Sequence, residues 1–84
     1  MDNNLLVEIY CAATGIIYDA FIPKYAYLSE VLVLLKGILS DLSEGSYKLD
    51  DMAIICNFEN GDIYNLNKLV YELGIKNGTR LMVI

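Results

Sequence analysis

Apolar and polar residues near the start of the chain follow the pattern of two β-strands joined by a short turn. Residues 5–11 are apolar apart from Glu8 and combine Val, Ile and Tyr, which favour strands. The turn that follows ends in Gly15, a residue that adopts the positive φ of tight turns without steric cost. A second apolar run, 16–22, ends at Pro23. We therefore predict a β-hairpin.

After Pro23 the spacing of apolar residues becomes that of an amphipathic helix. Apolar side chains recur at i, i+3, i+4 and i+7, which places them on one helix face. They are Leu28, Val31, Leu32, Leu35, Ile38, Leu39 and Leu42. Glu30 lies in the first turn, where a negative charge suits the helix dipole, and Gly45 is a natural C-terminal stop. The pattern predicts one long helix over about 28–43.

Beyond the helix, the pattern predicts two further strands. Residues 52–58 form the first of them, and residues 79–84 form the last strand of the chain. Each has an Asn-Gly pair beside it, which is typical of tight turns: Asn60-Gly61 and Asn77-Gly78. The intervening segments are a polar connection at 46–51, a stub of strand at Ile63-Tyr64 and a short helical turn at 66–73.

The order of the predicted elements is strand, strand, long helix, strand, short strand, short helical turn, strand. A hairpin followed by one amphipathic helix and a return to strands does not suit an all-parallel sheet. It suits an α+β fold in which a mixed sheet of four to five strands packs on one long helix, as in the β-grasp. The chain contains no internal repeat or low-complexity segment, so we expect one domain over residues 1–84.

The composition favours a small protein that binds other proteins. Of the 84 residues 56% are apolar, more than so short a chain can bury, and contiguous exposed apolar surface usually marks a partner site. The net charge is −5, and the 6 basic residues are scattered singly. Nucleic-acid binding needs a basic stripe, and the same charge repels an anionic membrane surface. We therefore expect neither nucleic-acid binding nor direct membrane insertion.

The sequence also predicts a cytoplasmic location. Its start, Met1-Asp2-Asn3-Asn4, is acidic and polar, unlike the basic start of a signal peptide. The most apolar stretch, 31–35, is closed by Lys36 and Gly37. A transmembrane helix needs about 20 apolar residues in a row, which this stretch does not approach.

No residue pattern indicates catalysis, a cofactor or a metal site. The chain has no His, which excludes Ser/His/Asp and Cys/His sets, and it has no phosphate-binding Gly-rich loop. Cys11 and Cys56 lack the CxxC spacing of redox and zinc sites, so we expect two reduced, buried thiols. Acidic residues near the predicted loops lack the spacing of a Ca²⁺ loop and are expected to form a solvated rim: Asp50, Asp51, Glu59 and Asp62. We predict a protein that is not an enzyme.

Two segments carry a family resemblance. The first is Tyr18-Asp19-Ala20-Phe21-Ile22-Pro23, followed by the predicted helix. The second is the ending Leu73-Gly74-Ile75-Lys76-Asn77-Gly78-Thr79-Arg80-Leu81-Met82-Val83-Ile84. Together with the short, acidic chain they resemble the YukD-like proteins, bacterial ubiquitin-like proteins found with type VII (WXG-type) secretion systems. The resemblance extends from Leu5 to Ile84 and implies a ubiquitin-like β-grasp fold.

The resemblance implies a cytoplasmic accessory of the secretion apparatus that works by docking, with no catalytic residues. Its partners would be protein components of the machinery, the membrane component or the ATPase, and would recruit it to the inner face of the membrane. A β-grasp adaptor or regulator unrelated to secretion is the alternative. Conjugation is not expected, because the sequence ends in Leu81-Met82-Val83-Ile84, without the Gly-Gly tail that activating enzymes use. A β-grasp protein that binds an iron–sulfur cluster would need four cysteine ligands, and this chain has two, so we expect no such cluster.

Strand alternation predicts which side chains face away from the helix. On the first strand, Glu8 marks the outward face, which it shares with Leu6 and Tyr10. On the last strand the same parity leaves Met82 and Ile84 outside.

The other two strands are assigned in the same way. On the second strand, Asp19 places Ile17 and Phe21 outside. On the third, Asn57 predicts that Ile55 points outward, which leaves three residues inward: Ile54, Cys56 and Phe58. The first and third strands would lie two strand spacings apart, about 10 Å, which is too far for a disulfide between the two cysteines.

In a β-grasp sheet the first and last strands are central, and the third lies beside the last. Five apolar side chains would then meet on the face turned away from the helix, edged by Glu8 and Arg80, and we predict that they form a docking patch. They are Leu6, Tyr10, Ile55, Met82 and Ile84. A misassigned pleat and covering loops are alternatives. The same face allows a weak homodimer. Val33 and Leu34 lie off the helix's core face and form either a second contact surface or a wider apolar stripe.

Overall fold

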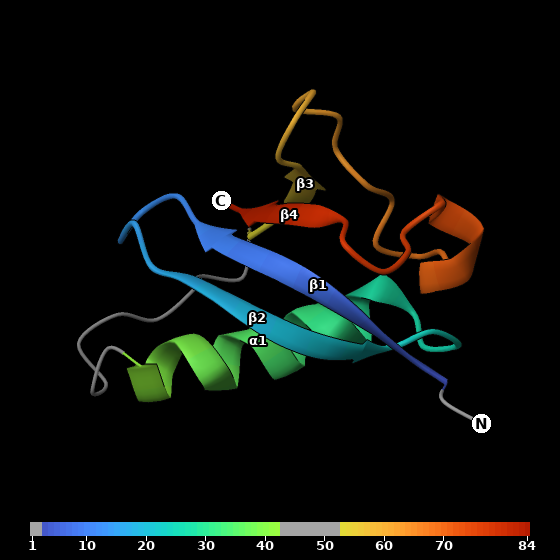
Figure 1. Ribbon diagram of the computed structural model, residues 1–84, viewed down its shortest axis with the longest axis horizontal. Helices are drawn as coiled ribbons and strands as arrows, with labels where there is room; N and C mark the ends of the chain where they lie inside the picture. Colours follow the sequence, from blue (N-terminus) through green and yellow to red (C-terminus); the bar gives the residue numbers. More distant parts are fainter. Residues whose placement is uncertain (1–2, 43–52) are drawn as a thin grey trace.

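The computed structural model describes residues 3–42 and 53–84. In these ranges the chain forms a four-stranded sheet with one long helix against one face, the predicted α+β arrangement (Figure 1). Strand order in the sheet is β2-β1-β4-β3. The elements are β1 (Asn4–Cys11), β2 (Ile17–Pro23), α1 (Leu28–Leu42), β3 (Ile55–Asn57), the 3₁₀ helix η1 (Val70–Leu73) and β4 (Arg80–Val83).

The sheet is mixed, as the sequence predicted. β1 pairs with β2 in an antiparallel hairpin and with β4 in parallel, and β3 pairs antiparallel with β4. The hairpin turn uses Gly15 at a φ of 74°, and the Gly15 N–H donates to the carbonyl of Cys11 at 2.8 Å. Pro23 belongs to β2 rather than following it, opposite Asn4. A proline is tolerated there because β2 is an edge strand.

The core lies between the sheet and α1. From the sheet it takes the inward residues of β1 and β4, among them Val7, Ile9 and Leu81, all nearly inaccessible to solvent. From α1 it takes the predicted helix face, with two exceptions: Ile38 is 37% exposed and Leu42 is 51% exposed. Ile38 lies at the edge of the apolar stripe and Leu42 in the last turn, so neither packs as the central positions do. The expected stop at Gly45 lies outside the described residues.

The third strand is shorter than predicted, and the side chains that face the core are those predicted to face outward. β3 covers Ile55–Asn57, and the predicted start at Met52 is not among the described residues. Ile55 is fully buried opposite Val83, whereas Phe58 is 41% exposed. The prediction that Ile55 points outward and Phe58 inward is therefore wrong.

The inversion has a local cause in Asn57. Its side-chain oxygen accepts hydrogen bonds from the backbone N–H groups of Glu59 at 2.8 Å and Asn60 at 3.2 Å. Its side-chain nitrogen donates to the Tyr64 hydroxyl at 3.0 Å. An Asn in this role builds the turn that follows the strand, and its polarity says nothing about which face meets water.

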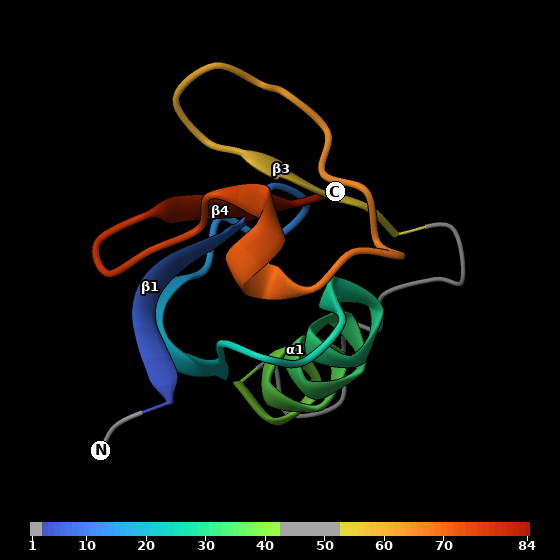
Figure 2. The same ribbon diagram turned by 90° about the vertical axis from the view of Figure 1, so that its right-hand side faces the viewer.

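The segments between β3 and β4 hold the C-terminal half against the rest of the fold. The predicted stub strand is a single antiparallel bridge between Cys56 and Ile63. The predicted helical turn is η1, which Figure 2 shows beside the start of α1. Val70 donates its backbone N–H to Ala26 at 2.9 Å and is fully buried.

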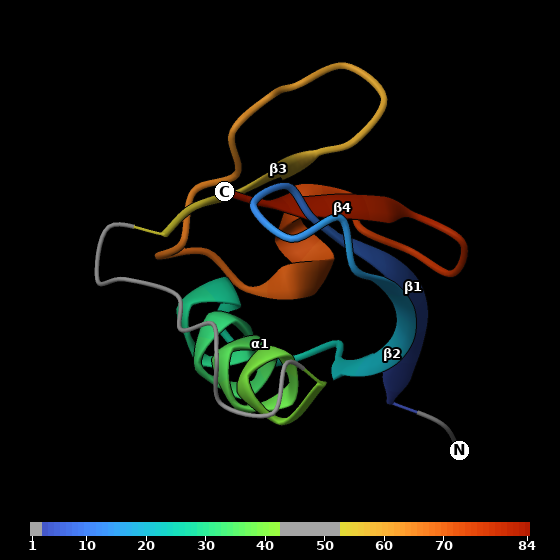
Figure 3. The same cartoon turned by 90° about the vertical axis from the view of Figure 1, so that its left-hand side faces the viewer.

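The predicted turn at Asn77-Gly78 binds directly to β1. The Leu6 N–H donates to the Asn77 side-chain oxygen at 2.9 Å, and the Gly78 N–H donates to the Leu6 carbonyl at 2.9 Å. These bonds fix the point at which β4 enters the sheet beside β1. The sheet curves, with α1 on its concave side and the opposite face turned away from the helix (Figures 2 and 3).

Candidate functional site

The face of the sheet opposite α1, called here the outer face, is built from alternate residues of β1, β2 and β4. Leu6, Glu8 and Tyr10 point to this face from β1. Each has a cross-strand partner on the same side, because paired residues in a sheet share a face. The residues of the outer face, including one from the turn after β3 and one just after β4, are Leu6, Glu8, Tyr10, Ile17, Asp19, Phe21, Phe58, Arg80, Met82 and Ile84.

Four of the five predicted patch residues lie on the outer face. Leu6 is 40% exposed and Ile84 is 53% exposed, while Tyr10 and Met82 are partly buried and directly paired between β1 and β4. The fifth, Ile55, is in the core, so it cannot contact a partner. The parity assigned to β1, β2 and β4 is confirmed, and that assigned to β3 is wrong.

Phe58 was not predicted to belong to the patch, because the sequence assigned the two faces of β3 the wrong way round. The Phe58 ring meets the Tyr10 ring edge-on, with centroids 5.3 Å apart and an interplanar angle of 72°. This contact adds an aromatic side chain to the patch beside Tyr10. Ile17 and Phe21 were expected on this face but not in the patch, although they are 59% and 66% exposed. Their pairing with Tyr10 and Leu6 across the hairpin was the signal that would have included them.

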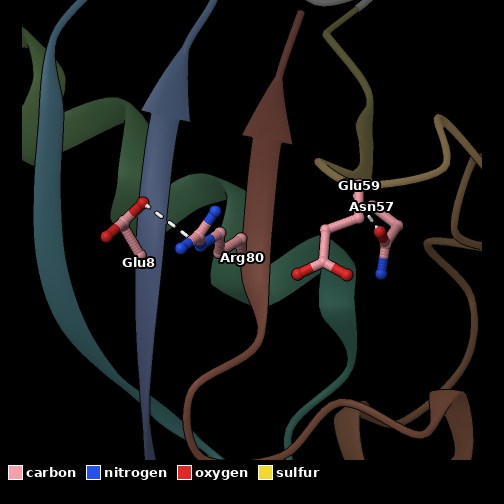
Figure 4. A network of polar contacts seen from close by, with 4 residues as sticks. All are labelled: Glu8, Asn57, Glu59 and Arg80. Carbon is pink, nitrogen blue, oxygen red and sulfur yellow. Dashed lines mark hydrogen bonds and ion pairs between the residues drawn. The ribbon is translucent and has the colours of Figure 1, made fainter.

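A row of charges crosses the outer face between its apolar residues. Glu8 on β1 lies directly opposite Asp19 on β2 and directly opposite Arg80 on β4. Figure 4 shows the Glu8 and Arg80 side chains pointing toward one another, with the Arg80 Nε atom 3.9 Å from a Glu8 carboxylate oxygen. Both side chains are about half exposed, so this ion pair contributes little to stability. Within residues 3–42 and 53–84, Asp19 has no ion pair.

A shallow hollow of about 490 Å³ lies beside this row. It spans β1, β2 and the turn before β4, so its lining combines apolar, charged and other polar residues. It is lined by Leu6, Val7, Glu8, Asp19, Phe21, Asn77, Gly78 and Arg80. A surface of this kind can receive a side chain from another protein.

The two cysteines are free, and β4 separates the strands that carry them. Cys11 belongs to the core, whereas Cys56 is paired with Met82 on the outward parity and is still only 1% exposed. Burial raises the pKa of the Cys56 thiol. Since the thiolate is the reactive form, Cys56 is a poor nucleophile.

No metal site is found in the part of the chain that the structure describes, because no three His, Cys, Asp or Glu side chains converge there. Asp50 and Asp51, two of the expected rim residues, lie outside the described residues, and Glu59 and Asp62 are exposed. None of the helices in the described ranges is long and apolar enough to cross a bilayer.

A second exposed apolar surface lies on α1. Val33 is 66% exposed and Leu34 is 53% exposed, so they do not widen the stripe that faces the core. Ile38 borders them. The interpretation of Val33 and Leu34 as a further contact surface stays open.

Neither a protein-family model nor a curated protein matches the sequence. Solved structures do match its fold. A chain of the MycP5-free ESX-5 inner membrane complex in state II gives a TM-score of 0.80 at 19% identity, covering 99% of this chain and 21% of that chain. This chain thus spans about a fifth of the matched one. The EccD5 ubiquitin-like domain from Mycobacterium xenopi gives a TM-score of 0.79 at 17% identity, covering 99% of this chain and 94% of that chain.

A eukaryotic domain shares the same architecture. The ubiquitin-like domain of yeast Ddi1 gives a TM-score of 0.74 at 20% identity, covering 99% of this chain and 90% of that chain. The chain has the ubiquitin-like fold. At these identities the matches show the fold alone, and function must be argued from the surface. Ubiquitin-like domains are typically binding modules without a catalytic site.

Proposed function

We propose that this ubiquitin-like chain is a non-enzymatic accessory of a type VII (WXG-type) secretion system that docks on protein components of the machinery through its outer face. The observation that carries the docking role is the group of apolar side chains exposed there, Leu6, Phe21, Ile17, Phe58 and Ile84. Soluble proteins rarely leave such side chains together on a sheet surface unless a partner covers them.

The secretion assignment has two supports. One is the resemblance of Tyr18–Pro23 and of residues 73–84 to the YukD-like proteins. The other is the similarity in fold to the EccD5 domain and to a chain of the ESX-5 inner membrane complex. On this proposal the partner is the membrane component or the ATPase, and the protein works in the cytoplasm, recruited to the inner face of the membrane.

An adaptor unrelated to secretion is the second candidate. The similarity to the ubiquitin-like domain of yeast Ddi1 favours it, because that match is nearly as good as the match to EccD5. The same outer face would serve either role, so the identity of the captured proteins separates the two candidates.

A pull-down from native lysate, identified by mass spectrometry, tests the proposal. Met82→Asp places a charge at the centre of the outer face, and Val33→Asp places the same charge on exposed α1 as the matched control. Circular dichroism establishes that both variants fold. We expect secretion components with the wild type and with Val33→Asp, and their loss with Met82→Asp.

Two other results would change the proposal. Capture of unrelated proteins by the wild type, still lost with Met82→Asp, would support the adaptor. Loss of the partners with Val33→Asp, and their retention with Met82→Asp, would move the docking surface to the helix and refute the outer face.

A further inference from the structure

We propose that the outer face binds a protein segment in which a Lys or Arg is flanked by apolar residues, and that this basic side chain lies in the hollow between Glu8 and Asp19. The inference rests on the proposed docking function and adds the chemistry of the partner. Its basis is the charge pattern of the outer face, where Asp19 forms no ion pair with any residue in 3–42 or 53–84.

Glu8 and Asp19 are directly opposite each other on neighbouring strands. Like charges in that arrangement repel, and the repulsion is a cost to the isolated protein. Arg80 offsets it only in part, because its 3.9 Å contact is to Glu8 and lies on the far side of β1 from Asp19. Among residues 3–42 and 53–84, Asp19 forms no ion pair. A cation from a partner placed between the two carboxylates would neutralise the negative charge that remains.

The apolar side chains around the two carboxylates suit the rest of such a side chain. Phe21 and Leu6, which are paired across the hairpin, flank the carboxylates on one side. Tyr10 and Ile17, also paired, flank them on the other. A Lys or Arg packs its aliphatic stem on apolar surface while its charged group reaches an acid. Arg can also stack on an aromatic ring and bind carboxylates with two hydrogen bonds. Apolar neighbours in the partner segment would cover the two flanking pairs.

A second copy of the chain fits this face less well. Glu8 lies between Asp19 and Arg80 in the charged row. Consider two copies paired by a two-fold axis through their outer faces, so that Arg80 of each copy lies against Asp19 of the other. The two Glu8 side chains would then meet and repel each other. Each copy further carries a net charge of −5, which opposes self-association. A basic partner segment meets neither obstacle.

Selection from a displayed library of random peptides against the full chain tests the inference. We expect enriched peptides to carry Lys or Arg next to apolar residues. The dissociation constant of an enriched peptide is then measured for the wild type and for Glu8→Gln/Asp19→Asn. Removing two exposed charge interactions should weaken binding about tenfold, and added salt should weaken binding to the wild type.

A control variant removes two negative charges from a different part of the molecule. Glu30→Gln/Asp41→Asn takes two carboxylates from α1, so it reports general attraction between an acidic protein and a basic peptide. We expect less than about a twofold change for this variant, because its charges lie on the far side of the fold. Equal weakening by both double variants would overturn the inference.

Tyr10→Ser separates this inference from the docking function, because it removes apolar surface without changing charge. Peptides without a basic bias that bind the wild type and lose binding with Tyr10→Ser would overturn the inference and leave the docking face in place. Peptides unaffected by Tyr10→Ser and by Glu8→Gln/Asp19→Asn would refute both. Failure to enrich any peptide would overturn the inference, and self-association in sedimentation would then identify a second copy as the occupant.

Discussion

Tyr18 has a buried side-chain oxygen that makes no hydrogen bond to any residue in 3–42 or 53–84. Its side chain points inward from β2 and packs against the core, so the hydroxyl is shielded from solvent. Burial, with a smaller contribution from the nearby Cys11, raises the pKa of Tyr18 to about 12. The neutral phenol is therefore favoured in the folded state relative to the unfolded one.

This shift predicts a loss of stability at alkaline pH that a single substitution should reduce. The pKa of Tyr18 is higher in the folded state, so its contribution is fully present below about pH 10 and is lost as pH rises toward about 12. Tyr18→Phe should raise the free energy of unfolding by about 1 kcal/mol at neutral pH, because the unpaired hydroxyl is gone. It should also reduce the fall in that free energy at alkaline pH.

Urea unfolding of the wild type and Tyr18→Phe at about pH 7, about pH 9 and about pH 11 measures both effects. The difference between the two curves matters, because other tyrosines and lysines also titrate in alkali. A lower stability of Tyr18→Phe at neutral pH would show that the hydroxyl has a partner, and would contradict the structure.

At the scale of the elements, a polar residue in an apolar strand predicts a face only where its side chain is free to meet water. Glu8 and Asp19 meet that condition, so the faces of β1 and β2 follow from the sequence. Asn57 does not, since its side chain bonds to Glu59, Asn60 and Tyr64. The sequence contained the Asn-Gly turn signal beside β3, but not the information that Asn57 belongs to that turn.

The inward position of Ile55 on β3 leads to a quantitative prediction. Ile55→Ala should lower the free energy of unfolding by about 2–5 kcal/mol, because it removes a fully buried side chain from a packed core. Ile63→Ala is the matched control in the neighbouring segment, where the side chain is 66% exposed, and should change stability by less than about 0.5 kcal/mol. Chemical denaturation measures both. Similar small losses for the two variants would restore the outward assignment of Ile55.

The architecture of the molecule was more predictable than its surface. Periodicity identified the hairpin, the long helix and the return to strands, because these patterns are local and strong. Which residues belong to the docking patch depends on pairing between segments that are distant in the sequence. The prediction was correct where the alternation of side chains was clear, as at Leu6 and Met82, but it left out Phe58. The hollow and the unbalanced Asp19 follow from the register of three strands and could not be seen in the sequence.

The outer face and α1 both expose apolar side chains among the described residues, and the proposed function uses the outer face. The outer face combines apolar side chains with a charged row, whereas α1 exposes Val33, Leu34 and Ile38 on the opposite side of the sheet. Charged groups set among apolar side chains give a docking surface specificity as well as contact area. This favours the outer face.

The most direct test is an NMR titration of the isotope-labelled protein with the partner recovered in the pull-down. Docking on the outer face predicts that backbone amide signals change in β1 and β4, around Tyr10 and Met82, while those of α1 around Val33 and Leu34 stay in place. Changes centred on Val33 and Leu34, with Tyr10 and Met82 unaffected, would contradict docking through the sheet.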